Sequence, residues 1–580
     1  MFGFSVQLDL SQREDNWPLS AGVSALDTSC RDLYLDNGDR LIMCGYFWGR
    51  SQQQLNDDLI ARDFEQLSHL DGHFCAALIS RGTVFLFNDR YRGKTVYWRR
   101  DADTLWMSSH LQNFEPDWLH FSNIGWQQCV NFRFVTNQHG FFNNINQLPI
   151  RSVAMITAAS DEVNHYQWSI ASLSATSFDE QCQRTKQALL ESLQKARKHH
   201  QSVAILLSGG VDSSLLAALA KQVFDDCLLV SARFDRFDGE LAMAKQFANS
   251  LQLPHLVVDI EDTQIYPSLT RLLEHYRKPL RHYSSLVVER LLSAIPASYT
   301  GVIYGEAADS MMGTFGVKKT LTKQRIKALT PAWLSRFLNR LPLPSNNKAD
   351  YLKQTANKTV DQLYCEAFAI DYGVHGQHFI SHHCAKNIAD RGQLECLTTP
   401  ASPSRIALVD FLIEHEVAQH FEETEIIAEL YQKQIISPFM EAKIYAISKS
   451  LSDTQYFGKQ WLKPVLRTLA SDYYPKAWIY QHKKGFPVPM QAWLTGSLAS
   501  AVAAAEDEVK SIGLSTQALT PQRDYEVYWL LINLHVLAGM SKQSGYLASL
   551  FTQCNAQTQT TSFTATETIS TPQSKRHVLR

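Results

Sequence analysis

The residues best suited to chemistry form a glycine turn between a strand and a helix. The apolar run 204–207 leads into Ser208-Gly209-Gly210, and a helical pattern opens near Val211. Free backbone N–H groups and the positive end of the helix dipole converge at such a turn, which favours a bound anion. The two glycines let oxygen atoms approach the backbone closely. No Gly-Lys-Ser/Thr follows, so the turn is not a Walker loop.

Polar side chains around the turn extend this candidate anion site. Ser208, Ser213 and Ser214 offer hydroxyl donors, and Asp212 offers the oxygen ligand that Mg²⁺ prefers when it accompanies nucleotide phosphates. The structural alternative is a Gly-Gly turn with a Ser or Asp helix cap, which is common in α/β proteins. For an isolated Ser-Gly-Gly the two interpretations remain equally open.

The elements that must position this turn alternate between strand and helix. A long helical pattern covers 178–200, and after it strands at 202–208, 227–234 and 255–260 are separated by helical runs at 211–224 and 239–252. Alternation of this kind predicts right-handed crossovers and a parallel sheet that is buried on both faces. The turn therefore lies at the mouth of a predicted parallel sheet.

The preceding part of the chain is different. Short runs at 41–48, 74–80, 83–89, 94–98 and 104–109 are dense in β-branched and aromatic residues and are broken by Gly, Asp and Arg. They predict antiparallel strands joined by hairpins. Residues 318–510 read as mostly helical. The chain is therefore predicted to be α/β, with an antiparallel β-rich part followed by a parallel α/β part.

Composition excludes several classes of protein. The chain has 580 residues, enough for two to four domains, and 45% of them are hydrophobic, which is enough to build packed cores. Lys plus Arg number 55 against 57 for Asp plus Glu, so nucleic acid is not an expected partner. No apolar run has the length of a membrane span, and the ten cysteines lack paired zinc-ligand spacing. We expect reduced thiols, a cytoplasmic location and a disordered tail at 555–580 that is rich in Gln, Thr and Ser.

The whole string at 204–220, AILLSGGVDSSLLAALA, is more specific than its glycine turn. It resembles the SGGxDS pyrophosphate loop of the N-type ATP pyrophosphatases, which cleave ATP between the α and β phosphates and transfer AMP to an acid or amide oxygen. The resemblance implies that ATP and Mg²⁺ are cofactors. It also implies nucleotide binding by Ser208, Gly209, Gly210, Asp212, Ser213 and Ser214.

Further strings narrow the resemblance to the asparagine synthetase family and its relatives, the β-lactam synthetases and lasso-peptide macrolactam cyclases. The segment 301–316, GVIYGEAADSMMGTFG, resembles the SGEGxDE segment of the family, and 478–494, WIYQHKKGFPVPMQAWL, resembles its K-x-G-F-x-x-P segment. Segments 237–260 and 436–447 also match, in family order. Toward the N-terminus, LDGHFCAALIS and FNDRYRGKTVYW resemble strings of class II glutamine amidotransferase domains.

This resemblance, which covers about 40–500, implies a domain organisation. It predicts a degenerate class II amidotransferase-like domain with an Ntn-hydrolase-like fold at 1–170. An ATP pyrophosphatase domain of the HUP-like kind, with helical additions, is predicted at 178–550.

The resemblance also assigns roles within the synthetase site. Gly305 lies in the nucleotide-binding segment, Glu306 holds the position of a carboxylate that orients or deprotonates the attacking amine, and Asp309 joins Asp212 in holding Mg²⁺. Lys483 would stabilise the released pyrophosphate, with Lys484 as the alternative if the register slips by one residue. Without the resemblance, GEAAD reads as an acidic helix start, and the Lys-Lys pair reads as solvated surface.

Departures from the family pattern carry their own expectations. The family glycine after the glutamate is Ala307, and Ser310 replaces an acidic residue, so the geometry at Mg²⁺ or substrate is expected to differ. Arg281 and His282 stand where asparagine synthetases often carry Asp-Pro-Ser, which argues against an aspartate substrate. Arg281 reads either as a ligand of a substrate carboxylate or as an exposed helix residue.

The glutaminase centre is the other departure. Class II amidotransferases use a cysteine at residue 2 and an Asn-Gly oxyanion element, and this chain has Phe2 and Cys44-Gly45 instead. We therefore expect ATP-dependent amide formation through an acyl-adenylate, with a small-molecule or peptide carboxylate and with ammonia or an amine as the nucleophile. The alternatives are an intramolecular macrolactam or β-lactam-type cyclase and a catalytically inactive nucleotide-binding relative.

Overall fold

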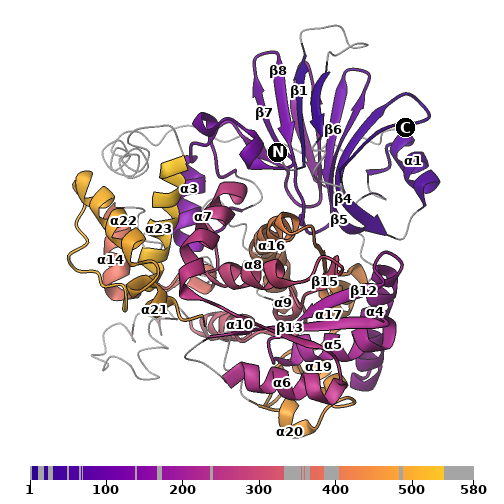
Figure 1. The fold of residues 1–580 in the computed structure, drawn as a ribbon, viewed down its shortest axis with the longest axis vertical. Helices are drawn as coiled ribbons and strands as arrows, with labels where there is room; N and C mark the ends of the chain where they lie inside the picture. The colour runs from indigo at the N-terminus through magenta and orange to yellow at the C-terminus, as the bar shows by residue number, and fades with distance from the viewer. Residues whose placement is uncertain are drawn as a thin grey trace.

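The structure is a computed structural model (Figure 1). It describes residues 3–10, 19–23, 30–48, 51–64, 67, 70–136, 140–165, 173–234, 239–331, 333, 337, 355, 358–359, 363, 366–383, 404–481 and 488–540. None of the helices in these ranges is long and apolar enough to cross a membrane.

Two antiparallel sheets form the N-terminal part of the chain. The first has the order β2-β1-β8-β7-β9, and the second has the order β11-β10-β6-β5-β4-β3. The strands of the first are β1 (Phe4–Asp9), β2 (Leu19–Val23), β7 (Tyr97–Asp101), β8 (Thr104–Ser108) and β9 (Asn146–Gln147). Those of the second are β3 (Cys30–Tyr34), β4 (Arg40–Trp48), β5 (Asp71–Ser80), β6 (Thr83–Asn88), β10 (Ser152–Thr157) and β11 (Asp161–His165).

Alternating side chains explain how these sheets pack. On β4, Ile42 and Cys44 enter the core shared with Phe4 and Met107 of the other sheet. Leu41 and Met43 point to the opposite face, where they share a core with residues of α1 (Gln52–Ile60) and the chain after it. Side chains of a strand alternate between the two faces of its sheet, so apolar residues at consecutive positions mean that both faces of this sheet are buried. The second sheet is therefore the middle layer of this part of the molecule.

A parallel sheet of order β14-β13-β12-β15-β16 forms the base of the remaining chain. Its strands are β12 (Ser202–Leu206), β13 (Asp226–Arg233), β14 (His255–Asp259), β15 (Gly301–Ile303) and β16 (Gln434–Ile436). The chain leaves β12 for β13 on one side and returns to β15 on the other, so the strand order reverses next to β12. Crevices that bind ligands in open α/β sheets lie at this kind of switch point, outside the carboxyl ends of the strands.

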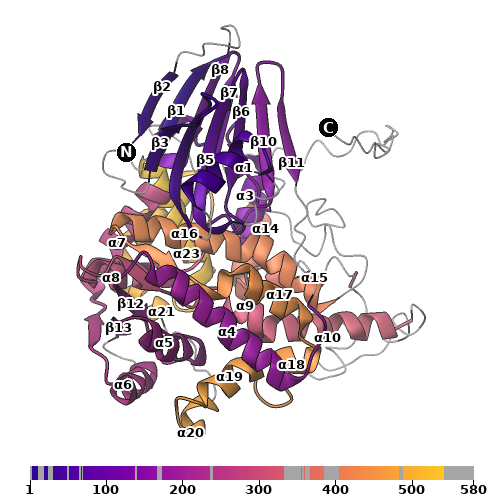
Figure 2. The same ribbon diagram turned by 90° about the vertical axis from the view of Figure 1, so that its right-hand side faces the viewer.

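Helices cover both faces of the parallel sheet (Figures 1 and 2). Below it in Figure 1 lie α5 (Val211–Val223) and α6 (Gly239–Leu251), and above it lie α8 (Ser284–Ala294) and α16 (Ala418–Leu430). In both views α16 lies between the antiparallel sheets and the parallel one. This helix therefore joins the two parts of the molecule.

The other helices surround this frame. They are α3 (Asn123–Phe132), α4 (Phe178–Arg197), α7 (Ile265–Tyr276), α9 (Ala308–Met312), α10 (Phe315–Leu329), α14 (Gly373–His383), α15 (Arg405–Phe411), α17 (Ala442–Ser450), α18 (Asp453–Phe457), α19 (Pro464–Ala470), α20 (Lys476–Ile479), α21 (Met490–Thr495), α22 (Ala499–Ser511) and α23 (Tyr525–Met540). A π-helical turn, Leu412–Val417, leads from α15 into α16.

The α/β fold class predicted from the sequence is confirmed, with antiparallel sheets first and a parallel sheet after them. The predicted strand at 94–98 is shifted, because β7 begins at Tyr97. The backbone of Lys94 instead donates to the buried carboxylate of Asp89, which also accepts from the N–H groups of Tyr91 and Gly93. A side chain that accepts three backbone hydrogen bonds holds this segment in a turn rather than in a ladder.

Candidate active site

The Ser208 turn and the segment after β15 lie side by side at the switch point of the parallel sheet. β12 and β15 are hydrogen-bonded neighbours, with Ile205 opposite Ile303. Both strands end within three residues of that pair, so the two loops that follow leave the same edge of the sheet. The structure thus brings together the two strings that the sequence places about 100 residues apart.

The turn has the backbone conformation that its glycines were expected to allow. Gly209 has φ +82°, and a Cβ there would lie 2.5 Å from the carbonyl oxygen of Glu240. Ser213 Oγ accepts from the N–H of Ser208 at 3.2 Å and donates to the carbonyl of Gly210 at 3.3 Å. Only glycine fits at residue 209, because any side chain would be strained and would meet backbone.

The three serines of the turn are engaged differently. Ser208 Oγ accepts from the N–H of Gly210 at 3.3 Å and lies 3.2 Å from Ser213 Oγ, so these two hydroxyls share one local network. Ser214 is fully buried, and its hydroxyl donates to the carbonyl of Val211 at 3.0 Å. The hydroxyl of Ser214 is thus engaged within its own helix.

Lys463 joins the two acidic residues of the site. Its ammonium lies 2.5 Å from Asp212 Oδ2 and 2.7 Å from Asp309 Oδ1, and its side chain is 6% exposed. Burial lowers the pKa of Lys463, but the carboxylates of Asp212 and Asp309 outweigh it and raise the pKa above its usual value. The lysine is therefore a fixed positive charge at the edge of the Ser208 turn.

Sequence reasoning did not find Lys463, and local structure shows how the chain holds it. Lys463 is in the left-handed region, with φ +57°, and Pro464 begins α19 directly after it. Arg467 donates to the carbonyl of Leu462 at 2.9 Å and to that of Ile479, which fixes the backbone on both sides of the helix. The sequence signal that could have pointed to this backbone arrangement is a lysine followed by a proline, because proline is preferred at the first position of a helix.

The two carboxylates fit a magnesium ion that accompanies a bound nucleotide. Asp212 Oδ1 is buried and has no hydrogen-bond partner in the described ranges, although the other oxygen of the same carboxylate is paired with Lys463. An oxygen in this state is a ready ligand for a hard cation, and Mg²⁺ commonly takes one or two protein carboxylates together with phosphates and water. Asp212 and Asp309 would hold the ion.

Glu306 lies three residues after the end of β15 and faces α16. Its Oε2 is 3.1 Å from Nδ1 of His420, and the two side chains are 10% and 14% exposed. Ala307, which replaces the family glycine, has φ +63° and forms the N-cap of α9. A non-glycine residue in this conformation is strained by about 1–2 kcal/mol, so the departure noted in the sequence carries a cost in the fold.

Arg281 fits neither of the alternatives left open by the sequence. It is buried, and its guanidinium donates to the carbonyl of Phe132 at 2.6 Å and lies 2.8 Å from Glu416. Its Nε donates to Nε2 of His282 at 2.9 Å. The guanidinium is already bonded on three sides within the protein, so it is neither an exposed helix residue nor a free ligand for a substrate carboxylate.

The structure does not place every predicted residue. Lys483 and Lys484 lie outside the described residues. Gly305 lies beside the turn, and a Cβ there would lie 3.8 Å from Cβ of Asp212, which is ordinary contact. No described neighbour therefore requires glycine at residue 305, which leaves room for a ligand on that side.

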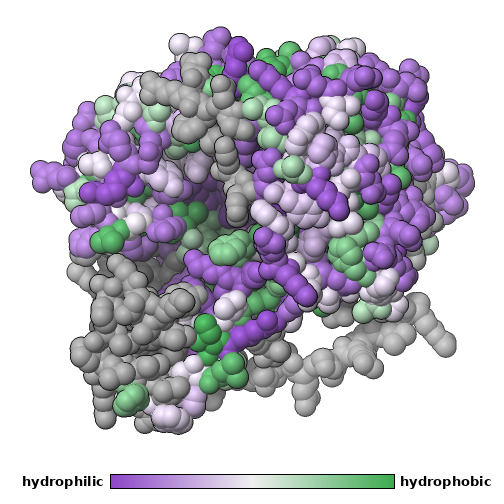
Figure 3. Space-filling view, turned by 90° about the horizontal axis from the view of Figure 1, so that it is seen from below, coloured by the Kyte–Doolittle hydropathy of each residue, from purple (hydrophilic) through white to green (hydrophobic). Residues whose placement is uncertain are grey.

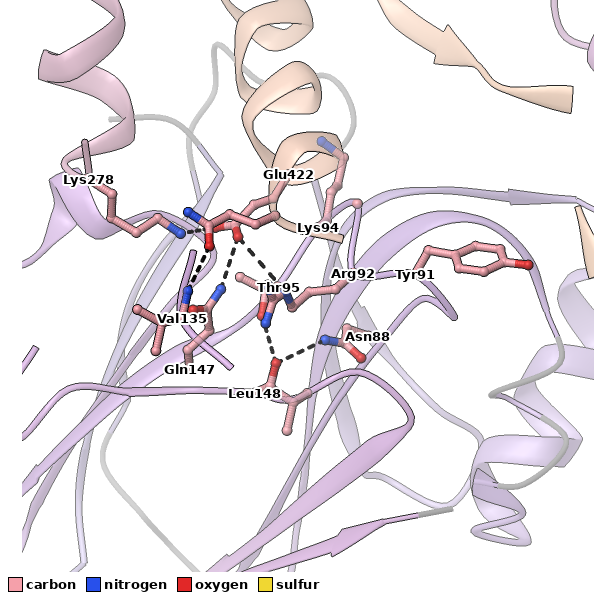
Figure 4. A network of polar contacts seen from close by, with 12 residues as sticks. Asn88, Tyr91, Arg92, Lys94, Thr95, Val135, Gln147, Leu148, Lys278 and Glu422 are labelled. Carbon is pink, nitrogen blue, oxygen red and sulfur yellow. Dashed lines mark hydrogen bonds and ion pairs between the residues drawn. The ribbon is translucent and has the colours of Figure 1, made fainter. Parts of the chain in front are cut away.

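A second polar cluster lies where the antiparallel sheets meet α16. Lys94 is paired with Glu429, His110 Nε2 lies 2.6 Å from the same carboxylate, and Glu422 accepts from Lys278 at 2.7 Å. Figure 4 shows Glu422 reached from the α/β part by Lys278 and from the β part by Gln147, whose amide donates at 3.0 Å. Charged pairs with little exposed surface thus connect the two parts of the molecule.

This cluster surrounds a small cavity that contains the expected oxyanion position. Cys44 lines it together with Lys94, Ser109, His110 and residues of α16. A hydrogen bond with Cys30 and burial raise the pKa of the Cys44 thiol well above its usual value. A protonated thiol is a weak hydrogen-bond donor, weaker than the amide of the Asn-Gly element that Cys44-Gly45 replaces.

The surface is hollowed on the side shown in Figure 3, where apolar side chains are visible along the hollow.

In the described part of the chain, no group of three or more His, Cys, Asp or Glu side chains could hold a metal ion. The magnesium site inferred above has only two protein carboxylates, so it depends on a bound phosphate to complete its ligands.

Comparisons with known proteins bear on the C-terminal part most directly. A family model described as Asparagine synthase matches residues 184–511. "Asparagine synthetase [glutamine-hydrolyzing] 1" of Bacillus subtilis is 19% identical over 450 residues, covering 75% of this chain and 70% of that protein.

Two other relatives match over shorter stretches. "Amidase chry2" of Gibberella zeae is 23% identical over 280 residues, covering 43% of this chain and 40% of that protein. A putative asparagine synthetase of Mycobacterium bovis is 19% identical over 322 residues, covering 53% and 48%. The chain thus spans less than half the length of these two relatives. A solved glutamine phosphoribosylpyrophosphate amidotransferase of B. subtilis covers 44% of this chain and 59% of its own, at 8% identity and a TM-score of 0.18, too low to bear on the fold.

Proposed function

We propose that this chain, which belongs to the asparagine synthase family, forms an amide bond by activating a carboxylic acid as an acyl-adenylate, with release of pyrophosphate. A carboxylate oxygen is a poor leaving group, and transfer of AMP to the acid replaces it with a good one. ATP-dependent amide ligation is the chemistry of this family, and the adenylate step is the part that experiment must test.

The observation that carries the proposal is the contact of Lys463 with both Asp212 and Asp309 beside the Ser208 turn. Attack on the α-phosphate builds negative charge on the departing pyrophosphate, and a fixed cation beside backbone N–H groups stabilises that charge. Bound Mg²⁺ would neutralise phosphate charge. In this proposal Asp212 and Asp309 hold the ion, Lys463 contacts the phosphates, and Gly209 lets the backbone approach them.

The amine step is assigned to Glu306. As the C–N bond forms, the attacking nitrogen becomes acidic, so a carboxylate within reach is a sufficient proton acceptor. The closeness of Glu306 to the carboxyl edge of β15 supports this role. Lys483, with Lys484 as the alternative, is proposed as a second cation for pyrophosphate on the resemblance alone.

We further propose that the chain hydrolyses no glutamine and uses ammonia or an amine directly. Cys44 supports this, because its protonated thiol is a weak hydrogen-bond donor where the family has an amide donor for the oxyanion, and Lys94, His110 and Glu429 around the cavity are paired with one another. The expected result is amide formation with ammonium salts, no amide formation with glutamine, and no glutamate released from glutamine.

The direct test is pyrophosphate release from MgATP in the presence of a panel of carboxylic acids that begins with L-aspartate. With an acid labelled with ¹⁸O in its carboxylate, one labelled oxygen should appear in AMP, because the acyl-oxygen bond breaks when the amine attacks. Asp212→Asn should lose both signals. ADP in place of AMP as the product, or unlabelled AMP, would exclude an acyl-adenylate.

A further inference from the structure

We infer that His420 is a positioning residue for amide formation, one that holds the carboxylate of Glu306 oriented for the attacking amine. The inference rests on the proposed function and adds to it a group that no sequence motif indicates. His420 comes from α16, more than 100 residues after the Glu306 segment, and only the fold brings the two together.

The geometry defines what His420 can do. Its Nδ1 lies 3.1 Å from Glu306 Oε2, which is hydrogen-bonding distance for a ring nitrogen and a carboxylate. Both side chains are largely removed from solvent, so neither is free to swing away into water. The contact engages one carboxylate oxygen, and we infer that the other oxygen accepts the proton.

The groups packed around His420 favour its protonated form. Glu306 faces it from the β15 loop, and Glu423 lies on its own helix, where it accepts from the backbone N–H of Arg281 at 3.2 Å and from the hydroxyl of Ser285. Burial lowers the pKa of His420, but the two carboxylates outweigh it, and the pKa is raised to about 9. His420 is therefore an imidazolium at neutral pH.

The charge of Arg281 has the opposite effect and lowers the pKa of His420, and His282 packs against the same ring. The ring of His282 meets that of His420 edge to face, with centroids 4.8 Å apart and an interplanar angle of 85°. His282 Nε2 accepts from Arg281 Nε, and burial holds the pKa of His282 well below its usual value, so this second imidazole is neutral. Tyr304 is also close, and burial with the charge of Glu306 raises the pKa of its phenol, which stays protonated. His420 is thus the protonated member of the histidine pair and lies next to Glu306.

The step can be written with its protons balanced. The amine nitrogen forms a bond to the acyl carbon, and the carbon–oxygen bond to AMP breaks, with the electron pair leaving on AMP. One proton of the nitrogen passes to Glu306, which becomes a neutral carboxylic acid, and it is lost to solvent after the product leaves. His420 keeps its proton throughout, which makes it a positioning residue and not a general acid.

The experiment uses the full chain with MgATP, L-aspartate or whichever acid of the panel gives the most pyrophosphate, and hydroxylamine as the nucleophile. Hydroxylamine is uncharged across neutral and alkaline pH, so the pH profile of hydroxamate formation reports on the enzyme. The variants are His420→Gln, which can still donate a hydrogen bond but carries no charge, and Glu306→Gln.

The expected result is a split between the two half-reactions. ATP–pyrophosphate exchange with the acid should stay within about threefold of wild type in His420→Gln, because no amine proton is moved. Hydroxamate turnover should fall about 100-fold, within the range for loss of acid–base assistance. The wild-type rate should also decline above about pH 9 as the imidazolium deprotonates, and this decline should be absent in His420→Gln. Wild-type turnover and an unchanged alkaline limb in His420→Gln would overturn the inference.

His415→Gln is the matched control. His415 is a partly buried histidine of the π-helical turn just before α16, and its ring stacks on Phe134 at a centroid distance of 6.2 Å. Its replacement tests the loss of a packed imidazole in the same segment, and both half-reactions should remain near wild type. An equal loss in this variant would assign the effect of His420→Gln to packing.

A measurement without substrate separates the two proposals. The imidazole of His420, assigned in a histidine-labelled sample by its absence from His420→Gln, should titrate near pH 9 in wild type and at least one unit lower in Glu306→Gln. An unshifted titration would overturn the pairing. Absence of pyrophosphate release with every acid, together with a normal titration, would instead sink the proposed function and leave the ion pair as a structural contact.

Discussion

The ammonium of Lys463 lies 2.5 Å from Oδ2 of Asp212, across a separation of 251 residues in the sequence. The same nitrogen is 2.7 Å from Asp309, so the lysine holds three distant segments of the chain at one point. Two carboxylates this close would repel each other without a cation between them. Lys463 is therefore needed both for the shape of the site and for its charge.

Lys463→Met should lower pyrophosphate release at least 100-fold, because the fixed cation beside the departing phosphates is lost. It should also lower the thermal stability of the protein without Mg²⁺, and added Mg²⁺ should recover part of it by separating the two carboxylates. Differential scanning fluorimetry with and without Mg²⁺ measures this. Lys459→Met, on an exposed residue of the same loop, should change neither quantity. Full pyrophosphate release in Lys463→Met would exclude the role.

Gly209→Ala should destabilise the protein by about 2–4 kcal/mol, because the new methyl group would meet the carbonyl of Glu240 and the residue would remain at positive φ. Gly210→Ala is the comparison. Its Cβ would lie 3.3 Å from Ser208 Oγ, and its φ of −81° suits any residue. This variant should fold with nearly normal stability and bind ATP more weakly. Urea unfolding and ATP titration separate the two effects, and equal stabilities would show that the turn tolerates a side chain at residue 209.

Ala307→Gly should stabilise the protein by about 0.5 kcal/mol. Relief of the left-handed strain contributes about 1–2 kcal/mol, and the greater freedom of glycine in the unfolded chain removes up to about 1 kcal/mol of that. Ala308→Gly, at the first residue of α9, relieves no strain and should destabilise. Urea unfolding of the pair gives the comparison, and a loss of stability in both would contradict the backbone conformation described for Ala307.

Glu429 should make stability depend on pH between about 4.5 and 2. Burial raises the pKa of its carboxyl, but Lys94 and His110 outweigh this and lower it to about 2. Because this pKa is lower in the folded protein than in the unfolded chain, the ionised carboxylate stabilises the fold by about 3 kcal/mol at pH values above the unfolded-state pKa. This stability is lost as the pH falls through the folded-state pKa. Glu429→Gln should flatten the pH dependence of unfolding in this window. Glu115→Gln, on an exposed carboxylate, should leave it unchanged.

Lys483→Met should reduce pyrophosphate release at least 100-fold, and Lys484→Met should leave it within about threefold of wild type. The expectation follows from the spacing of these lysines to Gly485 in the family string. The opposite pattern would move the assignment by one residue. Near-normal release in both variants would leave Lys463 to stabilise the pyrophosphate.

The sequence predicted the frame of the site better than its charges. Strand β12, helix α5 and the Ser208 turn follow from local pattern, because an apolar run, two glycines and a helical period are read within 20 residues. Asp212 and Asp309 could be proposed from the sequence because each lies in such a string. Lys463 and His420 could not be proposed, because the roles proposed for them depend on their distance to residues far away in the sequence, and neither residue type nor local spacing reveals that distance.

Arg281 illustrates the opposite error. An arginine where relatives carry a substrate-binding string invites a functional interpretation, but its partners, Phe132 and Glu416, come from two other segments and complete its hydrogen bonds. Whether an arginine is buried and fully hydrogen-bonded depends on the tertiary structure. The sequence therefore left two interpretations of Arg281 open, and the structure supports a third, a buried residue paired within the protein.

Helix α16 contacts the antiparallel part of the molecule with some of its side chains and the α/β part with others, so the two parts are not expected to function as separate fragments. Glu422, Glu425 and Glu429 recur at helical spacing and contact cations of the antiparallel part, Glu422 through Arg92 and the other two through Lys94, while Glu422 also pairs with Lys278 of the α/β part. His420 and Glu423 instead contact Glu306 and Ser285 of the α/β part. Excising the N-terminal 170 residues would remove Lys94 from Glu425 and Glu429 and His110 from Glu429, while Glu422 would keep Lys278. Helix α16, which carries His420, would then lose these contacts with the antiparallel part. We therefore expect the first part of the chain to be required for activity because it holds α16 in place, whether or not it hydrolyses glutamine.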